Sequence, residues 1–122
     1  MHALLIIAHG SRKPSYAEEI NLLVSRLEQQ LTGYDFVEYA FLELSEPSIG
    51  NACDRLIEKG TRKISAFPYF LAAGRHILED IPEEVNEVAQ RHPEININLM
   101  NYFGSTENNF NALCQELEVQ DQ

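Results

Sequence analysis

Basic residues are scarce in this chain, and it has no long apolar run. Nine lysines and arginines stand against nineteen aspartates and glutamates, which gives a formal charge of −10. A surface of this charge repels nucleic acids and anionic membranes, so we expect neither as a partner, and any anionic substrate needs a local basic patch. The apolar run at residues 3–8 is too short to cross a bilayer or to serve as a full signal segment. We therefore expect a cytoplasmic protein that does not bind a membrane.

Cysteine is also scarce. Cys53 and Cys114 lie far apart and form neither a CxxC motif nor a disulfide framework. This usage is typical of a reducing compartment, and we interpret both residues as buried thiols rather than metal ligands. With 122 residues, of which 44% are apolar, the chain is expected to fold as one domain over residues 1–122.

Short apolar segments that end in polar or turn-forming residues predict four buried strands. The first of these segments runs directly into His9 and Gly10. The third is followed by Pro68, which cannot donate a hydrogen bond to a neighbouring strand. The expected strands are residues 3–8, 36–42, 63–67 and 95–100.

Apolar residues at spacings of three and four predict helices after the first and second strands. Ser15 and Glu18 form a capping-box pattern, which predicts a helix that continues to about Leu31. Pro47 predicts the first turn of a second helix, and Gly60 is expected to end that helix in the left-handed conformation.

Two further helices follow the third and fourth strands. Residues 68–76 are expected to form a long loop that faces a ligand, and Pro82 predicts the first turn of the third helix. Residues 92–93 end that helix because the residue before a proline avoids helical geometry. The last helix is expected to begin near Ser105 or Thr106.

Strict alternation of strands and helices is typical of a parallel sheet with right-handed crossovers. We therefore predict an α/β fold, a three-layer domain in which a four-stranded parallel sheet carries helices on both faces. Ligands of such sheets bind outside the carboxyl ends of the strands. His9, Glu43 and the loop at 68–76 all follow strand ends, so we expect a binding site among them.

Two histidines stand at this predicted ligand edge. His9 closes the first strand, and His76 ends the long loop after the third. Neutral imidazole is the commonest protein ligand for Co²⁺, Ni²⁺, Fe²⁺ and Zn²⁺, and it can also accept a proton. A histidine at a strand end can equally bind only backbone, and an Arg-His pair in a loop is more often a plain surface feature. The residues alone leave both roles open.

Charged residues surround the two histidines. Glu43 follows the second strand and could be a third ligand, a base or an ordinary exposed glutamate. Arg12, Lys13 and Arg75 flank the histidines and could bind substrate carboxylates, which would supply the local basic patch that an anionic substrate requires. Each of these three could equally be a solvated surface charge.

Three segments of the chain resemble the small CbiX chelatases in their order and spacing. They are LLIIAHGSR near the start, FLELSEPSI after the second strand and FPYFLAAGRHILEDIP after the third, and together they span most of the first 82 residues. The family pattern is a strand ending in HGSR, an FLE-x-x-x-PS segment and a P-x-FL-x-x-G-x-H-x-x-x-DIP segment. His-Gly-Ser alone is a weak signal, whereas the third segment is long and specific.

The resemblance implies a chelatase-like enzyme that inserts a divalent metal, Co²⁺ first and Ni²⁺ or Fe²⁺ as alternatives, into sirohydrochlorin or a related tetrapyrrole. It implies no permanently bound cofactor and no nucleotide, because the metal is a substrate. Larger relatives contain two such halves and small members pair, so it also implies a homodimer. The residues that the resemblance assigns are His9 and His76 to the metal, these two and Glu43 to catalysis, and Ser11, Arg12, Gly74 and Arg75 to tetrapyrrole binding.

The chain departs from the family pattern after the fourth strand. Relatives usually continue with a Pro-Leu-Gly-x-His-like turn, whereas this chain reads NYFGSTENN, in which only Gly104 fits. The change leaves the preferred metal and macrocycle open. It also motivates an alternative, a catalytically weak tetrapyrrole- or metal-binding protein of the same fold. Phosphoryl transfer on a histidine is disfavoured, because Ala8 rather than arginine precedes His9.

Overall fold

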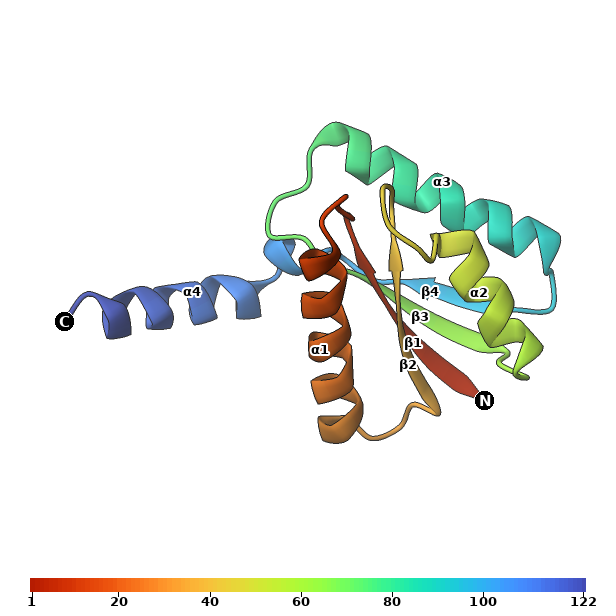
Figure 1. Ribbon diagram of the computed structural model, residues 1–122, viewed down its shortest axis with the longest axis horizontal. Coiled ribbons are helices and arrows are strands. Elements are labelled where there is room, and N and C mark those ends of the chain that lie inside the picture. Colours follow the sequence, from red (N-terminus) through yellow and green to blue (C-terminus); the bar gives the residue numbers. More distant parts are fainter.

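A computed structural model describes residues 1–122, in which four strands and four α-helices alternate along the chain (Figure 1). A short 3₁₀ helix, η1, precedes the last α-helix. The strands are β1 (His2–Ala8), β2 (Phe36–Phe41), β3 (Lys63–Pro68) and β4 (Asn96–Leu99), and the helices are α1 (Pro14–Gln30), α2 (Ile49–Glu58), α3 (Arg75–Arg91), η1 (Phe103–Ser105) and α4 (Glu107–Gln120).

The four strands form one parallel sheet in the order β2-β1-β3-β4, which confirms the predicted α/β architecture. Ala8, the last residue of β1, lies beside Phe41 of β2, and Ile7 lies beside Pro68 of β3. The three strands therefore end at the same edge of the sheet. This register brings the segments that begin at His9 and Leu42 close together.

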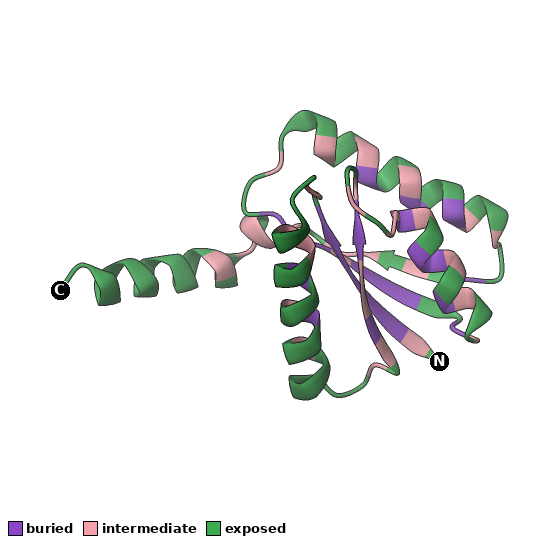
Figure 2. Cartoon of the chain, viewed as in Figure 1, coloured by how far each residue is buried: buried purple, intermediate pink, exposed green.

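The sheet is buried on both faces over β1, which explains why the first strand is a continuous apolar run. Its side chains alternate between two hydrophobic clusters, one under α1 and one under α2 and α3 (Figure 2). The cluster under α1 contains Leu4, Ile6, Ala8, Ile20, Val24, Val37 and Phe41. The larger cluster contains Ala3, Leu5, Ile7, Ala40, Ile49, Ala52, Cys53, Leu56, Ile64, Ala66, Phe70, Ile81, Val85, Val88 and Ile95.

The helix α4 packs on neither face of the sheet but extends away from it (Figure 1). Every residue of α4 from Phe110 onward is exposed (Figure 2). Three of the four predicted helices therefore cover the sheet, and the fourth does not. None of the helices is long and apolar enough to cross a lipid bilayer.

The prediction of two buried thiols is correct for one cysteine and wrong for the other. Cys53 lies in the core under α2, where burial, followed by the nearby charge of Asp54, raises the pKa of its thiol to about 12. Cys114 is exposed because it lies on α4, which has left the sheet. The sequence pattern predicted that Cys114 belongs to the apolar face of a helix, but it could not predict whether that face packs on the sheet.

The predicted capping box at the start of the first helix is wrong. The helix begins at Pro14, and Lys13 precedes it without a side-chain capping bond. Proline is well suited to this position because its backbone already has helical φ and the missing N–H has no partner in the first turn. Ser15 and Glu18 therefore lie inside the helix.

The start of α2 also differs from the prediction, since Pro47 lies ahead of the helix. Ser48 is the N-cap, and its hydroxyl accepts a hydrogen bond of 3.1 Å from the Asn51 N–H. The end of the helix is as predicted: Gly60 follows Lys59 with φ +98°.

The third helix begins earlier than predicted, so His76 lies in its first turn rather than in a loop. Gly74 is the N-cap, α3 starts at Arg75, and Pro82 lies in the helix interior. Proline there removes one backbone hydrogen bond. The helix continues through Pro82 because Ile77 and Ile81, which precede it, both pack on the larger hydrophobic cluster.

The last helix begins where it was predicted. Thr106 is the N-cap of α4, and its hydroxyl accepts a hydrogen bond of 3.2 Å from the Asn109 N–H.

Candidate functional site

The segments that follow β1 and β2 run side by side beyond the sheet. The Leu42 N–H donates to the Ala8 carbonyl at 2.9 Å, and the Glu43 N–H donates to the His9 carbonyl at 3.0 Å. Gly10 has φ +108°, and a Cβ atom there would overlap the Glu43 carbonyl oxygen. The absent side chain therefore lets the two backbones meet, and this contact places His9 next to Glu43.

A second contact ties the same two segments together. The Ser45 hydroxyl donates to the Ser11 carbonyl at 2.7 Å and accepts from the Ser11 N–H at 3.0 Å. The Ser11 hydroxyl in turn accepts a bond of 3.1 Å from the Lys13 N–H. Ser11 thus shapes the turn that leads into α1, and its role in substrate binding stays a prediction.

The side chains of His9 and Glu43 are hydrogen-bonded, with 2.7 Å between Nε2 and Oε1. Both are about half exposed, so the pair is open to a ligand. The ring of Phe70 lies 6.4 Å from the His9 ring, measured between centroids, and forms an apolar neighbour on one side. The structure therefore brings together two of the three residues predicted for catalysis.

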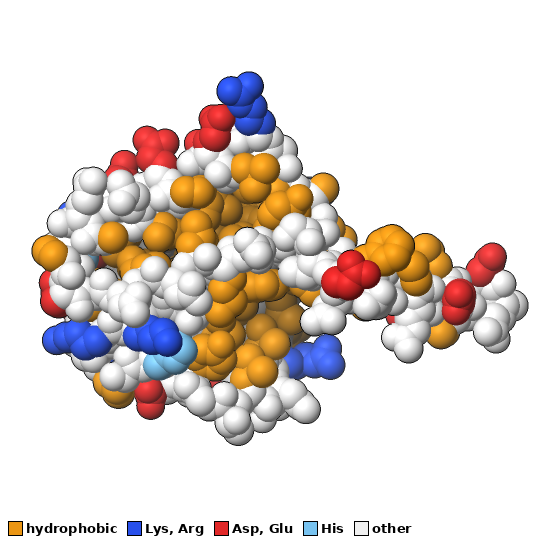
Figure 3. Space-filling view, turned by 180° about the vertical axis from the view of Figure 1, so that it is seen from behind, with side chains coloured by type: hydrophobic (Ala, Val, Ile, Leu, Met, Phe, Trp, Pro, Cys, Tyr) orange, Lys and Arg blue, Asp and Glu red, His pale blue; other side chains and the backbone are white.

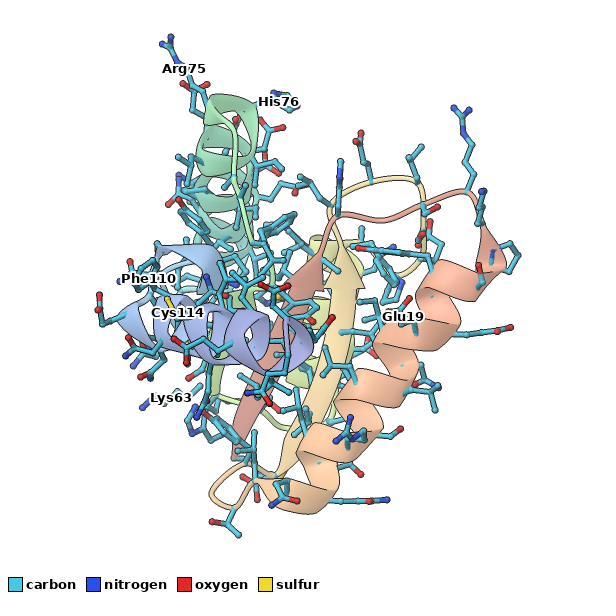
Figure 4. The ribbon with its side chains drawn as sticks, turned by 90° about the vertical axis from the view of Figure 1, so that its left-hand side faces the viewer. Glu19, Lys63, Arg75, His76, Phe110 and Cys114 are labelled. Carbon is cyan, nitrogen blue, oxygen red and sulfur yellow. The ribbon has the colours of Figure 1, made fainter.

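His76 is held by a carboxylate one turn further along α3. Its Nε2 lies 2.8 Å from Oδ2 of Asp80, while 82% of the His76 side chain is exposed. This contact is an ion pair by distance, and Nδ1 on the other side of the exposed ring can bind a metal or a proton. Figure 4 shows His76 on the side of α3 that faces the segments after β1 and β2.

Glu43 and His76 line one cavity of about 280 Å³. His9 does not line the cavity itself and is connected to it through its hydrogen bond to Glu43. No three histidine, cysteine, aspartate or glutamate side chains lie close enough together to hold a metal ion in this conformation. The remaining residues that line the cavity are Leu42, Asp80, Glu83, Glu84 and Glu87.

The wall of this cavity on α3 is a row of four carboxylates, Asp80, Glu83, Glu84 and Glu87. Burial raises the pKa of Glu84, and the charges of Asp80, Glu87 and Glu83 raise it further. One carboxyl oxygen of Glu84 is buried without a hydrogen-bond partner. The sequence analysis missed this row, although carboxylates spaced by three and four on one helix face were visible. Such a row attracts a divalent cation and can accept protons.

The basic residues predicted to bind carboxylates occupy different surroundings. The Arg75 side chain is 92% exposed, pairs with Glu79 at 3.0 Å and points away from His76 (Figure 4). Arg12 and Lys13 are exposed on the segment after β1 and form no ion pair. Gly74 has open space around it. Of the predicted carboxylate ligands, Arg12 and Lys13 are free to bind at the sheet edge.

An apolar groove of about 260 Å³ lies on the other side of the start of α3. Gly104 lies between the lining residues Tyr102 and Ser105 and ties their segment to the loop after β3: the Gly104 N–H donates to the Phe70 carbonyl at 2.7 Å, and a Cβ atom would overlap the Leu71 carbonyl. A flat apolar ligand suits such a groove. Its lining is Pro68, Ala73, Ile77, Leu78, Ile81, Pro82, Leu99, Met100, Asn101, Tyr102 and Ser105.

The sequence profile described as CbiX matches residues 3–120, which is nearly the whole chain. The chain belongs to the CbiX family. The match extends beyond the three segments of the resemblance, because it includes the altered segment after β4 and helix α4.

Relatives of this CbiX-family chain include chelatases named for two metals. The sirohydrochlorin ferrochelatase of Priestia megaterium is 31% identical over 96% of the chain and 44% of its own length. The sirohydrochlorin cobaltochelatase of Methanococcus aeolicus is 40% identical over 68% of the chain and 57% of its own length. The sirohydrochlorin cobaltochelatase of Sulfolobus acidocaldarius is 33% identical over 75% of the chain and 72% of its own length. The chain thus spans about half the length of two of these relatives.

Solved structures of CbiX-type proteins share the fold. A putative cobalamin biosynthesis CbiX protein from Marinobacter aquaeolei has a TM-score of 0.82 at 26% identity, and the match covers 98% of this chain and 97% of that one. SirB from Bacillus subtilis with Fe³⁺ has a TM-score of 0.81 at 29% identity, over 93% of this chain and 45% of SirB. The two matches cover different shares of the solved proteins because those proteins differ in length. The Marinobacter protein is similar in size to this chain, whereas SirB is about twice as long.

Proposed function

We propose that this CbiX-family chain inserts a divalent metal into sirohydrochlorin or a closely related tetrapyrrole. The observation that carries the proposal is an acidic cavity at the carboxyl edge of the sheet that is lined by Glu43 and His76, with His9 hydrogen-bonded to Glu43. The names of the relatives support both Co²⁺ and Fe²⁺ as the metal. Ni²⁺ has a similar preference for imidazole ligands. The metal is a substrate, and no permanently bound cofactor is required.

The reaction needs metal ligands and proton acceptors at the same place. A divalent ion enters the macrocycle as two pyrrole N–H protons leave, so each turnover releases two protons. His9 and His76 bind the incoming ion, and Glu43 accepts protons or completes the ligand set. The carboxylates of α3 favour the dication electrostatically and can pass on the released protons.

The distance within the His9–Glu43 pair suits this exchange of a proton for a metal. Ligand atoms at about 2.1 Å from an ion lie about 3.0 Å apart in adjacent octahedral positions and about 3.4 Å apart in tetrahedral ones. The Nε2 and Oε1 atoms are 2.7 Å apart, so a small opening of the pair admits an ion between them. The Asp80 carboxylate, 2.8 Å from Nε2 of His76, holds the ring beside the cavity and leaves Nδ1 for the ion.

The tetrapyrrole would lie beside this cavity. The apolar groove between the start of α3 and the segment after β4 offers a surface for the flat ring. Arg12 and Lys13 supply positive charge for the peripheral carboxylates, in a molecule whose net charge is otherwise strongly negative. The assignment of Ser11, Gly74 and Arg75 to substrate binding stays a prediction.

We further propose that the chain acts as a homodimer in the cytoplasm. One chain offers a single His9–Glu43 pair and an open cavity, and a second copy would cover the exposed side of a bound macrocycle. The cytoplasmic location rests on cysteine usage and on the absence of a long apolar run.

The test is anaerobic metallation of sirohydrochlorin, followed by absorbance with Co²⁺, Ni²⁺ or Fe²⁺ at limiting concentration. The wild-type protein should exceed the spontaneous rate, and His9→Ala and His76→Ala should each lower that rate about 100-fold or more, because each removes a metal ligand. His92→Gln is the matched control, since His92 lies at the end of α3 and pairs with Asp54. Wild-type rates in both alanine variants would contradict the assignment.

A second candidate function is a tetrapyrrole-binding protein with little turnover. One observation favours it: no three ligating side chains converge in this conformation. The same absorbance experiment separates the two functions. A spectrum that shifts on binding, without faster metal insertion, supports the binding protein.

A further inference from the structure

Leu44 has a backbone conformation that leucine rarely adopts. Its φ is +66°, and every other residue with a positive φ in this chain is a glycine. The Ser45 N–H donates to the Glu43 carbonyl at 2.8 Å, across Leu44. A hydrogen bond of this span around a residue with positive φ forms a γ-turn of the rare and strained kind. Leucine therefore costs stability here, because its side chain is crowded by its own backbone.

Contacts on both sides hold this strained turn in place. The Glu43 carbonyl fits against Gly10, where a Cβ atom would overlap it. The Ser45 hydroxyl donates to the Ser11 carbonyl and accepts from the Ser11 N–H. A residue in a strained conformation persists only where its surroundings fix it, and such residues concentrate at functional sites. The strain directly after Glu43 therefore points to a role of Leu44 in the same site.

The side chain of Leu44 is also unusual for its position, because it is large, apolar and 54% exposed. It does not line the acidic cavity, to which this segment contributes Leu42 and Glu43. Glycine or asparagine would adopt a positive φ at a lower cost. The chain thus has an apolar side chain at a position where neither the backbone nor the hydrophobic core requires one.

Two further exposed leucines follow the carboxyl end of β3. Leu71 is 71% exposed in the loop after this strand, and Leu78 is 50% exposed near the start of α3, where it lines the apolar groove. Figure 3 shows apolar side chains gathered in a hollow of the domain beneath α3, at the top of that view. The ligand edge of the sheet therefore presents apolar side chains as well as charged ones, which suits a flat ring with peripheral charges.

We propose that the Leu44 side chain contacts the ring of the tetrapyrrole beside the acidic cavity. The inference rests on the proposed function, in which the ring must reach Glu43 to give up its protons. Consecutive Cα atoms lie about 3.8 Å apart, so a macrocycle whose nitrogens reach the Glu43 carboxylate also lies within reach of the next side chain. An apolar side chain there adds affinity for the ring without competing for the metal ion. Leu44 thus binds substrate and takes no part in proton transfer.

The first test measures the binding of metal-free sirohydrochlorin by fluorescence titration, without any metal ion. Leu44→Ala keeps the backbone cost of a side chain but removes most of the apolar group, so the Kd should rise about 5- to 20-fold. Leu44→Met restores an apolar side chain of similar volume and should bind within about twofold of the wild-type protein. Leu31→Ala is the matched control, because Leu31 is an exposed leucine at the end of α1, far from the carboxyl edge of the sheet.

Each outcome of this titration decides the proposal. Equal affinities of Leu44→Ala and the wild-type protein would overturn it, even if the wild-type protein inserts metal. A Leu44→Met protein that binds as weakly as Leu44→Ala would also overturn it, because any change at this position would then have the same effect. Weaker binding by Leu44→Ala alone, in a protein that does not accelerate metal insertion, supports the contact and contradicts the chelatase function. A wild-type protein that does not bind sirohydrochlorin contradicts both.

The second test separates the side chain of Leu44 from its backbone. Leu44→Gly removes both the apolar group and the strain, so it should unfold about 2–6 °C above Leu44→Ala and yet bind sirohydrochlorin as weakly as that variant. Thermal unfolding and the same titration measure the two effects. A purely structural role predicts instead that the more stable glycine variant binds as well as the wild-type protein, and this result would overturn the proposal.

Discussion

At the scale of single residues, the orientation of His76 depends on Asp80, which lies one turn further along α3. The Asp80 carboxylate lies 2.8 Å from Nε2 of His76, and we expect this contact to favour the tautomer that keeps Nδ1 available. His9 has no such support from its own element, because its partner Glu43 comes from a different strand end. The two histidines of the site are therefore held in different ways.

Asp80→Asn should lower the rate of metal insertion about 10- to 100-fold at limiting metal, because an amide no longer fixes the His76 tautomer. The initial rate of the absorbance change measures this effect. Glu79→Gln is the control, since Glu79 pairs with Arg75 on the side of α3 that faces away from the cavity. Equal rates for Asp80→Asn and the wild-type protein would mean that Asp80 has no positioning role.

Glu84 gives the protein a pH-dependent stability of defined sign. Burial and the neighbouring carboxylates raise its pKa in the folded state, so the folded protein binds this proton more tightly than the unfolded chain. The stabilising effect is complete below the ordinary glutamate pKa of about 4.3. It is lost as the pH rises through the raised value in the folded state.

Glu84→Gln should therefore be more stable than the wild-type protein at pH 8, with a difference that shrinks as the pH falls towards 4. Urea unfolding of the two proteins across this range measures the difference. Glu18→Gln, an exposed glutamate of α1, is the control. A Glu84→Gln stability that tracks the wild-type protein at every pH would contradict the prediction.

At the scale of elements, the site depends on the close contact between the segments after β1 and β2. Gly10 permits this contact, because a side chain there would overlap the Glu43 carbonyl. Gly33, in the connection between α1 and β2, also has a positive φ, of +93°, but nothing lies near its absent side chain. Substitutions at the two glycines can therefore distinguish the cost of a positive φ, which both share, from the cost of the close backbone contact, which only Gly10 has.

Gly33→Ala should cost about 1–2 kcal/mol of stability, which is the penalty for a left-handed backbone at a residue with a side chain. Gly10→Ala carries the same penalty and must also push Glu43 away from His9, so it should lose more stability and most of the metal insertion rate. Thermal unfolding and the absorbance experiment measure the two effects. The same loss in both alanine variants would show that the close contact at Gly10 does not matter.

The helices also show where element boundaries follow from local signals and where they do not. The cap at Thr106 and the stop at Gly60 were predictable, because both act within one turn of the chain. The start of α3 at Arg75 was not, since Pro82 suggested a later first turn. Packing of Ile77 on the core outweighs the single hydrogen bond that the proline removes.

At the scale of the whole molecule, part of the negative charge is concentrated at the candidate site. Four of the acidic residues form the wall of the cavity on α3, where a divalent cation would enter. The basic residues Arg12 and Lys13 lie at the same edge of the sheet but on the segment after β1. The predicted basic patch is therefore smaller than expected, because Arg75 turns away from the site.

The sequence by itself determined the alternation of strands and helices, and with it the edge of the sheet at which His9, Glu43 and His76 lie. Apolar period and strand-end position are local properties, and the parallel connection follows from them. The match to the CbiX profile agrees with the three segments that the sequence offered.

Only the tertiary structure decided the contacts between these residues. The His9–Glu43 bond joins residues 34 positions apart. It depends on the register of β1 with β2 and on the close backbone approach that Gly10 permits. The acidic wall became part of the site only when α3 was placed beside Glu43. The periodicity of α4 predicts that one face of this helix needs an apolar partner, but it contains no information about which surface that is. That choice depends on shape and burial across the whole molecule, which no local pattern encodes.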